Sequence, residues 1–151
     1  MSNRETSRAD FEEFVAVCAQ RLLRTAFLLV GDRDAAERML EDALARTWLS
    51  WRRLDDQPET HVRRLLVRAA LKQPGPAGGG GDALWDRLGR LGRRQRAVVV
   101  LRYLDDLPEA ATADLLGCSE TTVRVREARA LAALGVDPTV PVPAPEAEGA
   151  A

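Results

Sequence analysis

The sequence has few of the residue types that build catalytic and metal sites. Among its 151 residues are two cysteines, Cys18 and Cys118, and one histidine, His61. A closed zinc site needs four such ligands at close spacing, so we expect no metal site and two reduced thiols. No nucleophile and base stand at a motif spacing, and the glycines at 78–81 lack the lysine and hydroxyl residue of a phosphate-binding loop. The sequence therefore predicts a protein that is not an enzyme.

The chain also lacks an excess of charge of one sign and any long apolar run. Its 22 basic and 23 acidic residues give a net charge of -1, so any nucleic-acid surface must be local. The N-terminus is polar, unlike a signal peptide, and no run approaches the ~18 apolar residues of a membrane span. We expect a cytoplasmic protein with no membrane partner.

Aromatic and β-branched residues are scarce as well. Aromatics make up 5% of the chain, and the one continuous β-branched run is 98–100, whose flanking apolar period favours a helix over a strand. Alanine, leucine and arginine dominate, and all three favour helices. The composition predicts an all-α fold.

Proline and glycine are concentrated in two segments. Residues 73–82 read QPGPAGGGGD, a composition that cannot pack and is typical of a flexible linker. Residues 136–151 alternate proline with small residues and predict an extended, disordered tail. The linker separates two predicted helical bundles, at 8–72 and 83–135.

Hydrophobic periodicity predicts three helices in the first bundle, over 11–30, from residue 33 to about Leu54, and over 59–72. The second helix carries an apolar stripe that ends in Trp48 and Trp51, which favours core packing over stacking on a melted base. The third has a basic side, either a solvated helix face or a DNA surface: Arg63, Arg64, Arg68 and Lys72. His61 is either a surface histidine or a DNA contact of the same region.

The second bundle contains a pattern typical of a helix-turn-helix, at 108–134. Ala113 supplies a small residue for the helix crossing, Gly117 the turn, and Ser119 the N-cap of the second helix. Leu116 and Val123 are the apolar anchors. The second helix then presents polar residues that could enter a major groove: Thr121, Thr122, Arg124, Val125, Arg126 and Arg129. The alternative is an ordinary helical hairpin with a solvated arginine face.

With both bundles in view, the chain resembles an extracytoplasmic-function sigma factor of the sigma-70 superfamily. Residues 24–54 and the following PETHVRRLL resemble region two of these factors, and residues 88–134 resemble region four. The resemblance covers about four-fifths of the chain and implies a transcription initiation factor that works without a cofactor. The partners it implies are core RNA polymerase, promoter DNA and an anti-sigma factor, with no small-molecule substrate.

The resemblance assigns three surfaces. It places the -35 contact on the second helix of the helix-turn-helix, and the -10 contact on the loop at 55–61, with His61, and on the basic side of 59–72. The polymerase contact falls on the second helix of the first bundle: Asp34, Glu37, Arg38, Glu41, Asp42 and Arg46.

Five departures from the family pattern leave alternatives open. Arg38 stands where members have an aspartate, and Glu41 where they have a glutamine. Thr121 and Val125 replace a small glycine and serine, and the basic segment expected after Lys72 is missing, which removes phosphate contacts. The alternatives are a divergent sigma-like interaction protein and a helix-turn-helix regulator, neither of which opens promoters.

Overall fold

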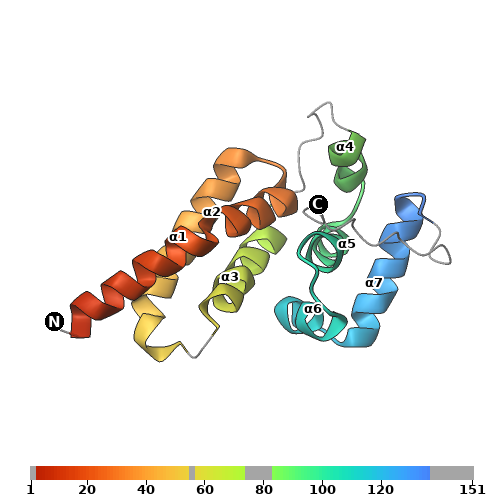
Figure 1. The fold of residues 1–151 in the computed structure, drawn as a ribbon. Helices are drawn as coiled ribbons and strands as arrows, with labels where there is room; N and C mark the ends of the chain where they lie inside the picture. Colours follow the sequence, from red (N-terminus) through yellow and green to blue (C-terminus); the bar gives the residue numbers. More distant parts are fainter. Residues whose placement is uncertain (1–2, 55–56, 74–82, 137–151) are drawn as a thin grey trace, which may run out of the picture.

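In the computed structural model, which describes residues 3–54, 57–73 and 83–136, every regular element within those ranges is a helix (Figure 1). This confirms the predicted all-α class. Residues 74–82 of the predicted 73–82 linker, Asp55 and Asp56 of the predicted -10 loop, and residues 137–151 of the predicted tail lie outside the described residues.

The N-terminal group consists of α1 (Asn3–Val30), α2 (Arg33–Ser50), the short 3-10 helix η1 (Trp51–Arg53) and α3 (Pro58–Lys72). Its boundaries follow from local chemistry. Gly31 has a φ of 73°, in the left-handed region that stops α1. Asp32 then caps α2, its carboxylate accepting the amide of Asp34 at 2.9 Å. The helix predicted to run to Leu54 ends earlier, at Ser50, and its last turn tightens into η1.

The C-terminal group contains α4 (Ala83–Gly89), α5 (Arg93–Val99), the π-helical turn η2 (Val100–Leu104), α6 (Glu109–Leu116) and α7 (Glu120–Ala133). The valine run at 98–100 is helical, as its flanking period predicts. The amide of Asp105 bonds to the carbonyl of Val100, five residues back, at 3.0 Å. This i to i-5 bond closes the wide turn at the end of the α5–η2 rod.

The two groups share one hydrophobic core. Leu22, Val62 and Leu66 from the N-terminal group are fully buried in the same cluster as Val100 and Leu101 from η2. Helices α5, η2 and α6 pack against α1 and α3, and the two groups lie side by side (Figure 1). The linker sequence does not by itself predict this packing.

An aromatic cluster fills the far end of the N-terminal group, where α1 and α2 extend past α3 (Figure 1). The rings of Phe11, Phe14, Trp48 and Trp51 lie in contact, with centroids 5.2 to 6.3 Å apart. Trp48 is 41% exposed, so the prediction of a core position is wrong for this residue. With two helices instead of three at that end, the bundle has no third element to cover the ring.

Candidate nucleic-acid interface

The turn between α6 and α7 has the geometry of the predicted helix-turn-helix. Gly117 adopts a left-handed φ of 66°, and the next amide, that of Cys118, bonds back to the carbonyl of Ala113 at 3.0 Å. Ser119 then caps α7, its hydroxyl accepting the amide of Thr122 at 3.1 Å. The turn therefore ends one helix and starts the next within three residues.

Packing at the helix crossing fixes the rotation of α7. Ala113 on α6 and Val123 on α7 are 5% and 0% exposed and meet Val98 of α5 in a small apolar cluster, with Leu116 beside it. Ala130, two turns further along α7, is also fully buried. These buried positions set which side of α7 faces solvent.

The solvent side of α7 carries most of the side chains that the sequence assigns to DNA. Thr121, Arg124 and Arg129 are exposed, and Val125 is 45% exposed. The remaining two, Thr122 and Arg126, are half-buried at the edge of this surface. The Thr122 hydroxyl lies 2.9 Å from that of Ser119, and Arg126 Nη1 lies 3.7 Å from the sulfur of Cys118.

Arg124 is oriented by an acidic residue on the neighbouring helix. Its Nε donates to Glu109 in the first turn of α6 at 3.0 Å, and the Arg124 side chain is 56% exposed. An exposed pair of this kind contributes roughly 0–1 kcal/mol to stability. A phosphate or a guanine edge can therefore take over the guanidinium at small cost.

A second network, which the sequence pattern does not predict, holds α7 from behind. The Tyr103 hydroxyl of η2 donates to Glu127 of α7 at 2.6 Å, and Arg102 Nε lies 3.6 Å from the same carboxylate. Burial first, and then the bond and charge of Glu127, raise the pKa of Tyr103 to about 12. Glu127 is thus turned away from the solvent side of α7, which limits negative charge there.

The basic side of α3 is less open than its sequence suggests. Arg68 and Lys72 are exposed, and His61 is half-buried. Burial, followed by the charges of Arg64 and Arg68, lowers the pKa of His61. The two arginines at its centre, however, contact the C-terminal group.

Arg63 and Arg64 each contact an acidic residue of that group. Arg63 Nε donates to Asp105 at 3.2 Å, and the Arg63 side chain is 11% exposed. Arg64 Nη2 donates to Asp114 on α6 at 2.6 Å. Neither aspartate is predictable from the sequence, because its partner lies 42 or 50 positions away and no local pattern links the two.

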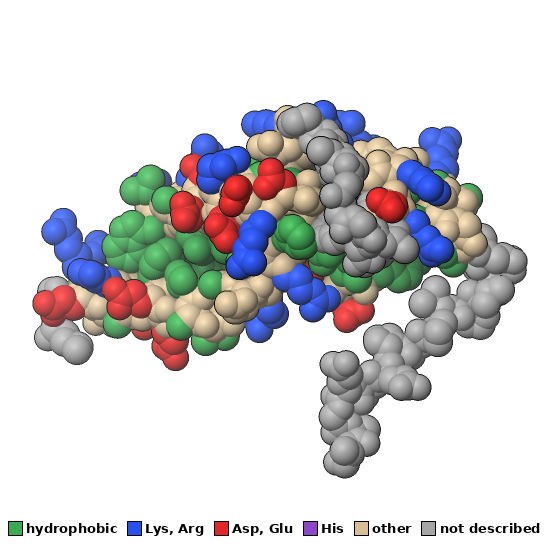
Figure 2. All heavy atoms as spheres, turned by 90° about the horizontal axis from the view of Figure 1, so that it is seen from above, with side chains coloured by type: hydrophobic (Ala, Val, Ile, Leu, Met, Phe, Trp, Pro, Cys, Tyr) green, Lys and Arg blue, Asp and Glu red, His purple; other side chains and the backbone are tan. Residues whose placement is uncertain are grey.

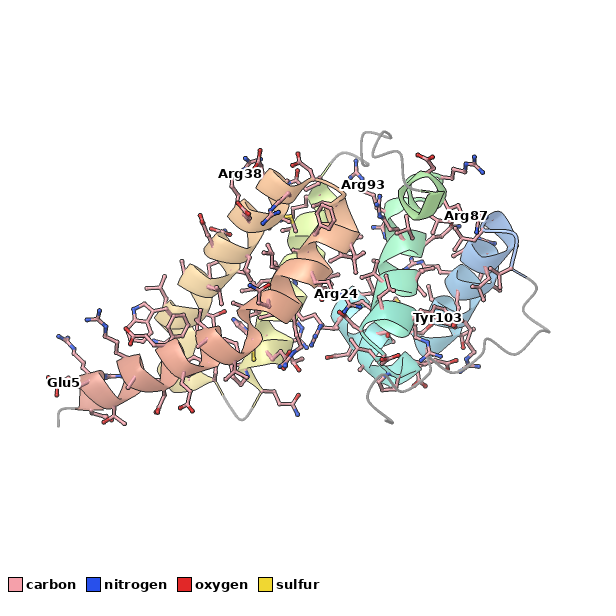
Figure 3. All side chains as sticks on the ribbon, turned by 45° about the horizontal axis from the view of Figure 1, so that its top comes forward. Glu5, Arg24, Arg38, Arg87, Arg93 and Tyr103 are labelled. Atoms are coloured by element: carbon pink, nitrogen blue, oxygen red, sulfur yellow. The ribbon has the colours of Figure 1, made fainter. Side chains whose placement is uncertain are left out.

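The outer side of α2 holds the residues expected to contact the polymerase. Positions 34, 37, 38, 41, 42 and 46 recur at helical spacing, and all are exposed except Glu37, which is half-buried. Glu37 pairs with Arg33 at 3.2 Å and Asp42 with Arg46 at 3.0 Å. Arg38 points outward from the helix (Figure 3). This face of α2 therefore carries both acidic and basic side chains.

The space-filling view shows the same character over a wider surface. Acidic and basic side chains alternate on the face seen from above, next to a broad hydrophobic area toward the N-terminal end (Figure 2). The exposed large apolar side chains of the N-terminal group are Val17, Trp48 and Leu49, at 62%, 41% and 83%. Exposed apolar surface of this kind is typical of a protein contact.

Within the described parts of the chain, no group of three or more His, Cys, Asp or Glu side chains is placed to hold a metal ion. No helix in those parts is both long and apolar enough to cross a bilayer. The side chains that gather into surfaces are cationic on α3 and α7 and of mixed charge on α2.

Comparison with known proteins places these surfaces in context. The family described as sigma-70, region 4 matches residues 81–134, which include the helix-turn-helix. The RNA polymerase sigma-E factor of Streptomyces coelicolor is 32% identical over 148 aligned residues, covering 83% of this chain and 84% of the relative. The sigma-E factor of Streptomyces avermitilis is 33% identical and covers 83% of each chain.

The fold also matches a solved structure, that of the sigma factor RpoE in complex with the anti-sigma factor NepR from Bartonella quintana. The TM-score is 0.65 at 21% identity, with 83% of this chain and 94% of that chain covered. The sequence relatives span both helical groups and the helix-turn-helix lies in the matched region. The chain therefore belongs to the extracytoplasmic-function sigma factors of the sigma-70 superfamily.

Proposed function

We propose that the chain binds core RNA polymerase in the cytoplasm and directs it to promoters through their -10 and -35 elements, without a cofactor. Family membership supports the general role. The exposed cations on α3 and α7 support the assignment of the -10 and -35 contacts to separate surfaces.

The observation that carries this proposal is the exposed N-terminal half of α7. Val123 and Ala130 fix the back of the helix, so Thr121, Arg124 and Val125 face outward together. In a major groove, arginine can bridge the N7 and O6 atoms of guanine, and a valine can contact a thymine methyl. Arg129, one turn further on, suits a phosphate. We assign the -35 contact to this surface, with Thr122 and Arg126 at its edge.

We assign the -10 contact to the basic side of α3. Arg68 and Lys72 are open to solvent, and Arg63 and Arg64 complete the row once their aspartate partners are released. Cations in such a row bind phosphates by releasing counterions, so the contact should weaken steeply with salt. His61, at the start of the row, lies within the same positive field.

We assign the polymerase contact to the outer side of α2. Its mixed charges suit a partner surface of similarly mixed sign, and charge complementarity of this kind governs partner choice more than affinity. The relative from Bartonella quintana was solved with an anti-sigma factor. By analogy, we propose that an anti-sigma factor also binds this chain.

A second candidate function is an interaction protein that binds polymerase or an anti-sigma factor without opening promoters. The pairing of Arg63 with Asp105 and of Arg64 with Asp114 favours it, because two of the proposed -10 cations are already occupied. A third candidate is a regulator that uses the helix-turn-helix alone.

Run-off transcription separates these functions. Purified protein is mixed with core polymerase and a library of genomic promoter fragments, and specific transcripts are sequenced. The proposed function predicts discrete transcripts that require the protein. Polymerase binding without transcripts would support the interaction protein, and DNA binding without polymerase binding would support the regulator.

A further inference from the structure

The contact between the two helical groups is charged where it meets the basic side of α3. Asp105, directly after η2, lies with both carboxylate oxygens 3.0 and 2.9 Å from the hydroxyl of Thr25 on α1 and accepts Nε of Arg63. The Asp105 and Arg63 side chains are 9% and 11% exposed. An ion pair this deep is costly to break on one side alone, because the remaining charge stays buried.

Asp114 forms the same kind of ion pair with the next arginine of α3, Arg64. Its carboxylate accepts Arg64 Nη2 at 2.6 Å, and this pair is more open, at 32% and 67% exposure. Asp105 and Asp114 together are called the acidic pair. Two carboxylates of the C-terminal group thus bind two consecutive guanidinium groups of α3.

Arginine side chains that bond to backbone carbonyls also hold the groups together. Arg93 of α5 donates to the carbonyl of Leu71 near the end of α3 at 3.0 Å, and Arg24 of α1 reaches the carbonyl of Leu104 at 3.4 Å. Both arginines lie at the junction of the groups (Figure 3). The junction is therefore a packed interface with specific polar contacts as well as a shared core.

This closed arrangement cannot place both DNA surfaces on one promoter. Helix α6 packs between α3 and α7, so at 8–10 Å between packed axes α3 and α7 lie roughly 20 Å apart. The -10 and -35 elements are separated by about 25 base pairs, roughly 85 Å of duplex at ~3.4 Å per base pair. The groups must separate before α3 and α7 can bind their elements together.

We propose that the chain is autoinhibited in this closed state, with the acidic pair occupying the α3 arginines in place of DNA phosphates. This inference rests on the proposed -10 role of α3. A carboxylate and a phosphate both bind a guanidinium through charge-assisted hydrogen bonds, so each excludes the other. When the groups separate, the two ion pairs with aspartate are replaced by two ion pairs with DNA phosphates. Arg63 and Arg64 therefore become exposed only when binding to DNA and polymerase compensates for the lost core contacts.

The test replaces both carboxylates by amides of the same shape, Asp105→Asn with Asp114→Asn, in the full-length chain. The matched control is Asp106→Asn: it removes a charge from the same turn, its side chain is exposed, and asparagine tolerates its positive φ of 54°. Affinity for a fluorescein-labelled single-stranded oligonucleotide of mixed sequence is measured by anisotropy. Amide hydrogen exchange over η2, α6 and α3 reports opening.

The double variant should bind the oligonucleotide about tenfold more tightly than wild type, because two phosphate-binding cations become available. Its interface amides should exchange faster, while the Asp106→Asn control changes neither property by more than about twofold. Asp114→Asn alone, at an exposed position that tolerates the change, should shift both in the same direction by a smaller factor.

Faster exchange without tighter binding than the control would overturn the masking of α3. Tighter binding without faster exchange would show that the gain in affinity comes from the lost negative charge alone, and this result would also overturn the proposal. Run-off transcription by the same variants tests the proposed function separately. Transcripts from every variant with no gain in binding would reject autoinhibition while leaving the sigma role intact, and no transcripts from any variant would reject that role.

Discussion

Arg124 lies at the centre of the exposed α7 surface, where it forms an ion pair with Glu109. We expect Arg124→Ala to weaken binding to a cognate -35 duplex by about 1–3 kcal/mol, because a bidentate arginine–guanine contact contributes that much discrimination. Fluorescence anisotropy at low salt measures the change. Arg52→Ala, an equal loss of charge at an exposed position of η1, serves as the control. Equal affinities for the two variants would remove Arg124 from the DNA contact.

His61 provides a pH-dependent probe of the α3 surface. Burial and the nearby Arg64 and Arg68 lower its pKa below the usual 6.5. The folded chain therefore binds this proton less well than the unfolded chain does. The stabilising effect of the neutral imidazole is complete above the unfolded pKa of about 6.5 and is lost as pH falls through that value toward the folded pKa.

His61→Gln should remove this part of the pH dependence. We expect the free energy of unfolding of wild type to fall more than that of the variant when the pH is lowered from about 7.5 to about 5.5. Chemical denaturation at each pH measures it. Because the chain has one histidine, the ring proton resonance titrates without ambiguity. A titration midpoint at or above the ordinary value would contradict the prediction.

At the scale of elements, the turn between α6 and α7 depends on one backbone conformation. At Gly117, φ is 66° and a Cβ would meet no atom within 4 Å, so the cost of a side chain there is conformational. We expect Gly117→Ala to lower the free energy of unfolding by about 1–2 kcal/mol, and Gly117→Asn to cost less. Thermal or urea unfolding measures both.

Gly89, the last residue of α4, is the matched control. A Cβ there also meets nothing within 4 Å, and no positive φ opposes it. Gly89→Ala should be neutral or stabilising by up to about 1 kcal/mol, since alanine favours a helix. If the two alanine substitutions had the same effect, the left-handed turn would not be the cause.

The elements themselves were largely predictable because their signals are local. Pro58 starts α3 through the φ that its ring fixes, while Ser119 at the cap of α7 and Gly117 after α6 bond to residues three or four positions away. A single sequence contains all of that information. The exposed position of Trp48 was not predictable from its stripe, because it depends on where α3 begins relative to the end of α2.

At the scale of the whole molecule, two arginines of α5 cap helices of the other group. Arg96 is 1% exposed and donates to the carbonyl of Leu28 in the last turn of α1, while Arg93 donates to Leu71 in the last turn of α3. The last carbonyls of a helix lack intrahelical partners and carry the negative end of its dipole. One turn of α5 thus stabilises two helix ends.

Arg93→Ala should therefore lower the free energy of unfolding by about 1 kcal/mol, through loss of a charged hydrogen bond to a helix end. Arg94→Ala is the control, because Arg94 is exposed in the same turn and its positive charge lies at the unfavourable N-terminal end of α5. Urea denaturation of both variants measures the difference. Equal losses would show that the carbonyl contact contributes nothing.

The contacts between the groups are the part that the sequence could not predict. Arg63 and Asp105 lie 42 residues apart, and Arg96 and Leu28 lie 68 apart, with a segment of proline and glycine between them. Composition indicates that such a segment permits many relative positions, and only the three-dimensional packing selects one. The DNA-facing residues of α7 were identifiable because the helix-turn-helix is short and self-contained.

The α5–η2 rod makes the closed state sensitive to chain length. Each residue of an α-helix advances the chain by about 100° around the axis, so removing one residue from the α-helical part at 93–99 would swing Asp105 by roughly that angle. Its carboxylate would then point away from Thr25 and Arg63. We therefore expect single-residue insertions or deletions in α5 to distinguish relatives whose two halves pack together from relatives whose halves are permanently independent.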